Sequence, residues 1–414
     1  MVVLLSGFSA GILVERLVID GDRSFTDTRG DSDLDTVAGV IEENYLYRPA
    51  DAGAREKFRE ELERTAIEGM LASLDDAYTR YLVPVEAAVA SDQLDGEYGG
   101  VGVTLQPAHG LLVVARITPD SPASRAGVAA GDVIQRVDGQ PVDEEGEPTL
   151  IGDLRGPVGS NVELLIQRPE VTNPIRLSLT RETIIVHPVS FEMIPATSYA
   201  RIRIDIFGDR TTDELDEAIA MAGTRGATGI VLDLRGNGGG WVTSAQETIG
   251  RFVEANEGPA LLEDADPETG GEYELPILNP ERAPTNMPIV VLVDRNTASA
   301  AEIVAGSLHD YDRALIVGEQ TFGKGSVQRI FDFDDGASLR VTVAEWITPN
   351  RSRIEDAGIG PDVVVDSAAY GTTSGDPFIR AATSMLESGI SRPTDLAAAG
   401  EATALRATPA AAEE

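Results

Sequence analysis

Residues 289–311 read IVVLVDRNTASAAEIVAGSLHDY, and this stretch decides the fold class. Its first part is an apolar run that ends near Asp294, which predicts a strand buried in a sheet. A helical pattern begins near Ala300. Ser299 stands at the junction, where a hydroxyl meets the free N–H groups of a helix N-terminus. The spacing Ser299-x-x-Glu302 also fits a capping box, so a structural role and a nucleophilic role are both open.

Strand and helix patterns alternate around this stretch, from about residue 183 to residue 365. The run GIVLDLR at 229–235 predicts a second strand that is buried in a parallel or mixed sheet. Residues 94–182 differ, because short alternating stretches with glycines between them predict a small β domain. Residues 34–88 carry a helical period. Together these patterns predict a mixed α/β chain with several parts.

The composition excludes several classes of function. The chain has 414 residues, of which 33 are basic and 69 acidic, for a net charge of −36. Nucleic-acid binding and attachment to anionic lipid are disfavoured, because both need a basic face. Cysteine is absent, which excludes disulfides and thiolate catalysis. Only three histidines are present, so few His-dependent mechanisms are available.

The N-terminus carries an apolar run at residues 2–14, VVLLSGFSAGILV. It is shorter than the roughly 20 residues that a spanning helix needs. We interpret it as the remnant of a signal or membrane anchor, because a polar, linker-like stretch follows it. The alternative is an ordinary buried element. The anchor interpretation predicts an extracytoplasmic protein of the cell envelope or periplasm, either membrane-anchored or secreted.

A second motif lies at residues 314–333, ALIVGEQTFGKGSVQRIFDF. It resembles a phosphate-binding P-loop, but Gly325 stands where that loop requires Ser or Thr after Lys324. A P-loop also opens a helix, whereas the residues that follow alternate like a strand. We therefore favour another role for Lys324, which is one of only two lysines among 33 basic residues.

Lys324 fits the role of a general base for Ser299. A desolvated lysine can lose its proton near neutral pH, whereas an arginine cannot. A Ser–Lys dyad needs no histidine, which suits this chain. Gln328 follows Lys324 by four positions, and in an extended segment both side chains would point to the same face. Gln328 would then orient the amine.

The segment at 94–182 resembles a PDZ domain. Its glycines precede a predicted strand, and SPASRAG and GDVIQRVDG follow between Ser121 and Gly139. Such a loop can turn its N–H groups towards a carboxylate, while the next strand offers an edge to an extended peptide. The expected ligand is a peptide C-terminus. The carboxylate loop is predicted at Gly99, Gly100, Val101 and Gly102.

The whole chain resembles the C-terminal processing peptidases of family S41, also called tail-specific or carboxyl-terminal proteases. TASAAEI is followed 25 positions after its serine by Lys324, and then by Gln328. The other motifs of the resemblance are AIEGMLASLDDAYTRYL at 66–82, GIVLDLRGNGGGWV at 229–242 and EWITPNRSRIEDAGIGPDVVV at 345–365. The resemblance covers about residues 34–385 and implies a ClpP/crotonase-like αβ protease core with an inserted PDZ domain.

The resemblance also implies roles for individual residues. Ser299 corresponds to the nucleophile, Lys324 to the general base and Gln328 to the orienting third member. The backbone N–H groups of Gly239 and Ala300 would form the oxyanion hole. This chain departs from the usual Asn-Pro-Gly-Gly by carrying Gly238 in place of proline, which leaves the loop more flexible.

We therefore expect a serine endopeptidase that cleaves protein substrates near exposed C-termini, with a homodimer as a further expectation. The resemblance implies no metal and no organic cofactor. The alternatives are a catalytically silent PDZ relative that binds peptides, and a ligand-binding relative on the same fold. The predicted segments are an N-terminal apolar segment and linker at 1–30, a helical region at 31–93, a PDZ domain at 94–182, the peptidase core at 183–370, a C-terminal helix at 371–392 and a disordered tail at 393–414.

Overall fold

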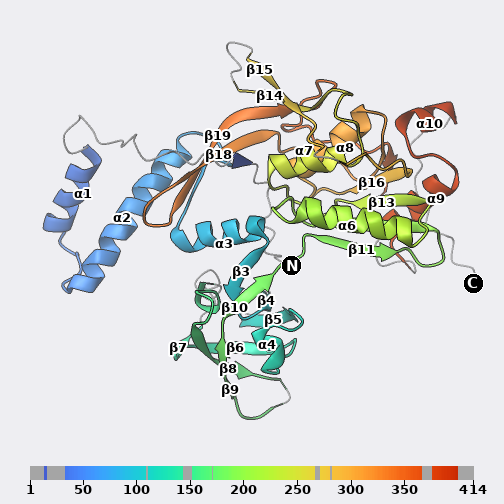
Figure 1. Ribbon diagram of the computed structural model, residues 1–414. Helices are drawn as coiled ribbons and strands as arrows, with labels where there is room; N and C mark the ends of the chain where they lie inside the picture. The colour runs from blue at the N-terminus through green and yellow to red at the C-terminus, as the bar shows by residue number, and fades with distance from the viewer. Residues whose placement is uncertain are drawn as a thin grey trace, which may run out of the picture.

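The computed structural model describes residues 14–15, 33–108, 111–142, 152–169, 171–265, 271–279, 282–365 and 375–399. Figure 1 shows three parts: a pair of N-terminal helices that projects from the body, a small β domain, and a larger body of helices and sheets. The small β domain is inserted between the helical N-terminal region and the large body, in the order that the sequence predicts.

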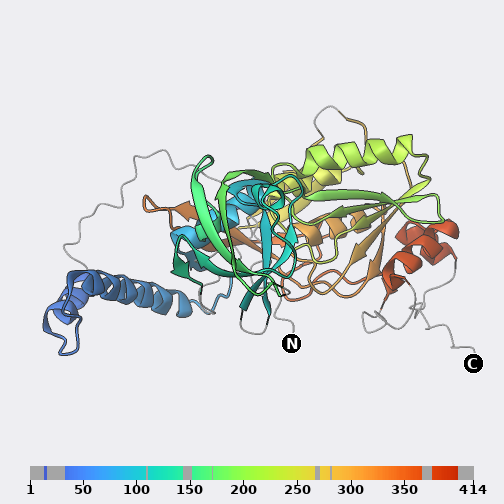
Figure 2. The same ribbon diagram turned by 90° about the horizontal axis from the view of Figure 1, so that it is seen from below.

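The N-terminal region is helical. Its elements are α1 (Asp33–Asn44), α2 (Ala52–Ala72), the short strand β2 (Arg80–Leu82) and α3 (Pro84–Asp95). Helix α2 begins after Asp51, whose side chain accepts the Ala54 N–H, and none of its residues is buried. Both views show the α1–α2 pair extending away from the rest of the protein (Figures 1 and 2). Strand β2 brings this region back, because it pairs with the large body.

The small β domain is built on an antiparallel sheet with the order β4-β5-β6-β8-β9. The apolar residues of its alternating strands form a core of their own around Val114, Ile134 and Leu164. Strand β4 lies at the edge of this sheet. The elements are β3 (Glu97–Gly100), β4 (Val103–Ala108), β5 (Leu111–Ile117), α4 (Pro122–Arg125), β6 (Val133–Val137), β7 (Gln140–Pro141), β8 (Asn161–Gln167), β9 (Ile175–Thr180) and β10 (Glu182–Ile185), with β3 paired to β10.

The large body contains a mixed sheet with the order β11-β12-β13-β16-β17-β20, in which only β11 is antiparallel to its neighbour. Every residue of β13 and β16 is buried, because helices cover both faces. Helices α6, α7 and α8 pack on one face, and α9 (Pro377–Glu387) packs on the other. The strands are β11 (Val189–Met193), β12 (Tyr199–Ile204), β13 (Gly229–Asp233), β16 (Ile289–Val293), β17 (Leu315–Gly318) and β20 (Val363–Val364), and the helices are α6 (Thr211–Thr224), α7 (Val242–Gly250) and α8 (Ala300–Asp310).

A second sheet has the order β1-β18-β19-β14-β15, and β2 pairs with β19 beside this path. Its strands are β1 (Val14–Glu15), β14 (Pro259–Asp264), β15 (Glu272–Pro276), β18 (Ser326–Asp332) and β19 (Ser338–Ile347). Strand β1 runs parallel to β18, and the backbone of Val14 lies opposite Gln328. The outer edge of β18 is therefore paired with the chain's own N-terminal segment at this point.

The C-terminal part differs from the prediction of a disordered tail from residue 393. Helix α9 (Pro377–Glu387) is followed by α10 (Pro393–Ala398). The prediction is wrong for this short helix, because polar contacts hold it in place: the Thr394 N–H donates to Asp312, and Asp395 accepts the Ser391 and Arg392 N–H groups. Residues 400–414 lie outside the described residues.

The predicted N-terminal anchor lies almost entirely outside the described residues, since only Val14 of the run 2–14 belongs to them. Among the helices that the structure describes, none combines the length and the apolar character that crossing a membrane requires.

Candidate active site

Ser299 lies at the turn between β16 and α8, as the sequence predicts. Its backbone has φ 57° and ψ −120°, a conformation that non-glycine residues rarely adopt and that strains the turn. The residue is 0% exposed, and its Oγ has no hydrogen-bond partner within the described part of the chain. A buried hydroxyl without a partner is an exception that calls for a physical reason, and a reacting group is one such reason.

Only half of the capping box at Ser299 is formed. The Glu302 carboxylate accepts the Ser299 N–H at 2.8 Å, which is the contact expected of the acidic member. The Ser299 hydroxyl does not make the reciprocal bond to the backbone of the first turn. The capping contact that the sequence predicts is therefore made by Glu302, and the Ser299 hydroxyl takes no part in it.

Glu302 also holds the loop that carries Lys324. Its buried carboxylate accepts the Gly323 N–H at 2.7 Å and the Lys324 N–H at 2.9 Å, and it accepts the Thr321 hydroxyl as well. Burial raises the pKa of Glu302, while these hydrogen bonds act to lower it. We assign the ionised form, since three backbone N–H groups and a hydroxyl converge on the carboxylate. One side chain thus fixes the backbone at both predicted catalytic positions.

Lys324 is 3% exposed. Its Nζ lies 4.5 Å from the centre of the Tyr78 ring, which belongs to the segment between α2 and β2. Burial, reinforced by the charge of Arg340, lowers the pKa of Lys324 to about 7. A lysine with this pKa is largely neutral at slightly alkaline pH, which is the form that can accept a proton. Strand β18 follows it, where a P-loop would open a helix.

Gln328 lies in β18 and is also buried. Its Nε2 donates to the Ser326 hydroxyl at 3.0 Å and to the Thr342 hydroxyl at 3.3 Å, whereas its Oε1 has no partner. The prediction that the Lys324 and Gln328 side chains share a face assumed one regular extended segment. The structure differs, because Lys324 precedes β18 and a register shift separates Val327 from Gln328. The Oε1 atom of Gln328 therefore remains able to accept a hydrogen bond.

The glycine-rich loop at 236–240 lies directly against Ser299. A Cβ placed on Gly239 would come within 2.8 Å of the Ser299 Cβ and 3.1 Å of the Ala300 nitrogen, and φ at Gly239 is +110°, so only glycine fits. Ala300 is the first residue of α8, where an N–H has no partner inside the helix. The Gly239 N–H, however, donates to the Asn237 side-chain oxygen at 2.8 Å. One of the two predicted oxyanion donors is therefore engaged within the loop.

Two protein-family models match this chain. The model of peptidase family S41 matches residues 198–365, and a PDZ domain model matches residues 113–168. The carboxy-terminal processing protease CtpA of Bacillus subtilis is 33% identical over 376 residues, which cover 89% of this chain and 77% of the relative. The chain belongs to peptidase family S41. It is a serine-type C-terminal processing protease, and the predicted family and enzyme class are confirmed.

One further relative and one solved structure are similar to this S41 peptidase. A carboxy-terminal-processing protease of Bartonella bacilliformis is 33% identical over 335 residues, which cover 78% of this chain and 75% of the relative. A solved S41-family structure from Bacteroides fragilis covers 88% of this chain and 99% of its own, with 22% identity and a TM-score of 0.52. The predicted fold class is confirmed by this match and by the PDZ match.

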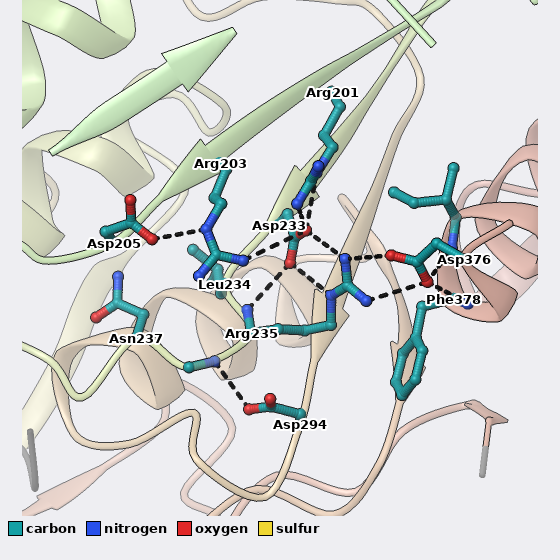
Figure 3. Close-up of polar contacts among 12 residues, drawn as sticks. Arg201, Arg203, Asp205, Asp233, Leu234, Arg235, Asn237, Asp294, Asp376 and Phe378 are labelled. Atoms are coloured by element: carbon teal, nitrogen blue, oxygen red, sulfur yellow. Dashed lines mark hydrogen bonds and ion pairs between the residues drawn. The ribbon is translucent and has the colours of Figure 1, made fainter. Parts of the chain in front are cut away.

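Behind the glycine-rich loop of this S41 peptidase lies a charged cluster that sequence reasoning missed. Figure 3 shows Arg201, Arg203 and Arg235 around Asp233, at the end of β13. Arg235 contacts Asp233 at 2.6 Å and Asp376 at 2.9 Å, and Arg201 contacts Asp233 at 2.7 Å. Burial acts to raise the pKa of Asp233, but Arg235 and Arg201 outweigh it and the pKa is lowered. The signal was two charges within an otherwise apolar run, Asp-Leu-Arg.

This cluster fixes the start of the loop, and Asn237 fixes its middle. The Gly236 N–H donates to Asp294 at 2.9 Å, which ties the loop to the end of β16 (Figure 3). The Asn237 side chain donates to the Ile204 carbonyl at 2.9 Å, and its backbone carbonyl accepts the Ala298 N–H. The loop and the turn before Ser299 are thus held together through Asn237.

The predicted carboxylate loop of the PDZ domain begins inside a strand: Gly99 and Gly100 are the last residues of β3, and only Val101 and Gly102 lie between β3 and β4. A Cβ at Gly99 would come 2.2 Å from the Gly156 carbonyl oxygen, and one at Gly102 would come 2.3 Å from the Ser121 Cβ. Gly100 pairs with β10, and the Val101 carbonyl accepts the Ala123 N–H. The glycines therefore serve close packing of this loop, which leads into the edge strand β4.

Proposed function

We propose that Ser299 is the nucleophile of this protease and that Lys324 is its general base. The observation that carries the proposal is the buried Ser299 Oγ, which has no partner at the N-terminus of α8 while its backbone is strained. The buried Lys324, with a pKa lowered to about 7, supports the second role. Glu302 supports the pairing, because its carboxylate accepts N–H groups from both residues.

In the proposed reaction the neutral Lys324 amine takes the Ser299 proton as Oγ attacks the scissile carbonyl carbon. The tetrahedral intermediate collapses, the peptide C–N bond breaks, and the leaving amine takes the proton from Lys324. Water then attacks the acyl-enzyme ester with Lys324 again as base. This step releases the new C-terminus and restores the Ser299 hydroxyl. The steps need no group beyond the chain and water.

The negative charge of the intermediate would be stabilised by the N–H groups of Ala300 and Gly239. The Gly239 N–H must first exchange the Asn237 oxygen for the substrate oxyanion, since it donates to Asn237 at 2.8 Å. Gln328 fits a positioning role, because its unpaired Oε1 can accept a hydrogen bond from the Lys324 ammonium.

We further propose that the PDZ domain binds the substrate's C-terminus. Strand β4 is an edge strand, which can accept an extended peptide as an additional strand. The loop at Gly99–Gly102 precedes this strand, in the position of a carboxylate-binding loop. Binding there would recruit proteins with exposed C-termini, and the domain would also be placed to regulate the active site. The extracytoplasmic location, the membrane anchor and the homodimer remain predictions from the sequence.

The dyad is tested with an unfolded protein substrate and a serine-reactive fluorophosphonate probe. Ser299→Ala and Lys324→Ala should each abolish cleavage and labelling while the circular dichroism spectrum stays native. The double variant should be no worse than either single variant, because the two groups act as a unit. Lys324→Arg should also be inactive, since arginine keeps its proton. Substantial cleavage by Lys324→Ala would overturn the lysine base, and cleavage by Ser299→Ala would overturn the nucleophile.

A further inference from the structure

Arg340, in the middle of β19, is a buried cation that forms no ion pair with any residue that the structure describes. It is 8% exposed, and its buried Nε has no hydrogen-bond partner among those residues. The other buried arginines among the described residues all have acceptors: Arg251 contacts Asp216 at 2.8 Å, Arg235 contacts Asp233 at 2.6 Å, and Arg181 donates to two backbone carbonyls. A buried charge without compensation is strongly unfavourable. Such a group therefore indicates that an anion arrives from outside the described chain.

The register of the second sheet places Arg340 on the face of the active site. Gln328 lies opposite Thr342, and their side chains are hydrogen-bonded, so both point to the same side of the sheet. Arg340 precedes Thr342 by two positions in the same strand, so it points to that side as well. Its opposite residue on the other flank is Arg80 of β2. A row of polar and basic side chains thus runs from Gln328 across β19.

The charges around this row are predominantly positive. Burial and the charge of Arg80 together lower the pKa of Arg340 to about 10, although Asp332 of β18 acts in the opposite direction. Arg340 is in turn the largest charge acting on Lys324, where Glu355 and Asp76 oppose it and Arg80 reinforces it. Arg80, Arg340 and Lys324 therefore form a region of positive potential that includes the predicted base.

We propose that Arg340 is the centre of a substrate subsite that binds a carboxylate. The inference rests on the proposed function, since it requires a peptide at Ser299. A guanidinium matches a carboxylate with two parallel hydrogen bonds, and water exclusion strengthens such a pair. The carboxylate is either an Asp or Glu side chain near the scissile bond or the free α-carboxylate of a substrate with a short tail. The subsite adds a selectivity within the unfolded chain to the recognition of the terminus.

The proposal is tested first by binding, so that it does not depend on catalysis. Ser299→Ala protein is titrated with fluorescein-labelled unstructured peptides in which each Glu is exchanged for Gln, and with free-acid and amidated C-termini. An exchange at one position, or amidation, should weaken binding about 10- to 150-fold, the range of a charged hydrogen bond. Dependence on a Glu position identifies a side-chain carboxylate, and dependence on amidation identifies the α-carboxylate. Equal binding of all peptides would overturn the subsite.

The second arm uses variants in the Ser299→Ala background. Arg340→Gln should bind the acidic peptide as weakly as the neutral one, whereas Arg340→Lys should retain part of the preference. Arg329→Gln is the matched control: it removes the same charge one strand away, opposite Val341, on the other face of the sheet. It should leave the preference unchanged. If the amidation effect arises at this site, Arg340→Gln in the full chain should abolish it; an amidation effect that persists in Arg340→Gln belongs to the PDZ loop and overturns the α-carboxylate as the ligand of Arg340.

The third arm measures cleavage by the unmodified chain. At one pH, kcat/KM should favour the acidic member of the peptide pair through KM, and Arg340→Gln should equalise the two. If Arg340→Gln shifts only the pH profile and the peptides stay equal, Arg340 tunes Lys324 and binds no substrate, which overturns the proposal. If acidic peptides bind to the Ser299→Ala protein as described but the unmodified chain does not cleave them, the subsite is supported and the proposed dyad is refuted.

Discussion

Raising the pH from 6 to 8 should increase the rate of acylation at Ser299 about tenfold, because only the neutral Lys324 amine can take the proton. The pKa of Lys324 is lowered from 10.5 to about 7 by burial and by the charge of Arg340. With that pKa, about one-tenth of the enzyme carries a neutral lysine at pH 6 and about nine-tenths at pH 8. The profile should therefore show one ascending limb with its midpoint near neutrality.

The same proton affects stability, and the direction follows from linkage. Between about pH 7 and pH 10.5 the unfolded chain binds the Lys324 proton and the folded chain does not, so stability rises with pH across this window. The full shift corresponds to about 5 kcal/mol at ~1.4 kcal/mol per pH unit. Lys324→Met removes this term, so the variant should be more stable than the wild type at pH 6, and the difference should shrink as the pH rises to 10.

The two parts of this prediction are measured separately. The rate of labelling by a fluorophosphonate, followed from pH 5.5 to 9, reports the neutral fraction of Lys324, and urea unfolding at pH 6 and pH 9 reports the stability. Arg340→Gln should move the limb to higher pH, because it removes a positive neighbour. A flat profile, a midpoint above pH 9, or a Lys324→Met variant less stable than wild type at pH 6 would refute the reasoning.

Four further predictions concern neighbouring features. Glu302→Gln preserves the side-chain volume but weakens the hydrogen bonds to the Ser299 and Lys324 backbones, so kcat should fall at least tenfold with little change in KM. Unchanged steady-state kinetics would contradict this. Gly238→Pro should raise the free energy of unfolding by roughly 0.4–1 kcal/mol, by restricting the unfolded chain, as urea titration can show. Contacts with Asp310 and Asp362 raise the pKa of His309 to about 10, so its contribution to stability is complete below pH 6.5 and is lost as the pH rises through 10; His309→Gln should destabilise the fold at pH 6 by roughly 1 kcal/mol, after screening, and leave the pH limb in place. Amidating the C-terminus of a protein substrate should weaken recruitment by about 10- to 150-fold, measured as KM.

The parts of the fold that sequence reasoning reached are those with a strong local signal. Five consecutive buried residues in β16, followed by a helical period, define the strand–turn–helix at Ser299. The small β domain follows from alternating strands and glycine turns. The short helix α10 was missed, because its anchors at Asp312 and Asp395 are polar contacts that leave no apolar period.

The parts of the site that sequence reasoning missed depend on pairs far apart in the chain. Arg80 faces Arg340 only because β2 joins the edge of β19, and nothing local to either residue indicates that pairing. The cluster at Asp233 likewise needs Asp376 at the start of α9 and Arg201 from β12. The role of Gln328 was argued from an extended segment, and the register shift at Val327 could not be read from the spacing.

Glu302 explains why two readings of one motif were both supported by the sequence. The hydroxyl of a serine at a helix N-terminus usually accepts a hydrogen bond from a free N–H group of the first turn, and such a hydroxyl is unavailable as a nucleophile. Here a carboxylate three positions later satisfies the Ser299 N–H and also binds the backbone at Lys324, while the hydroxyl keeps no bond. The capping box is therefore used from one side only. A motif that predicts a helix start can coexist with a nucleophile when its acidic member alone supplies the structural contact.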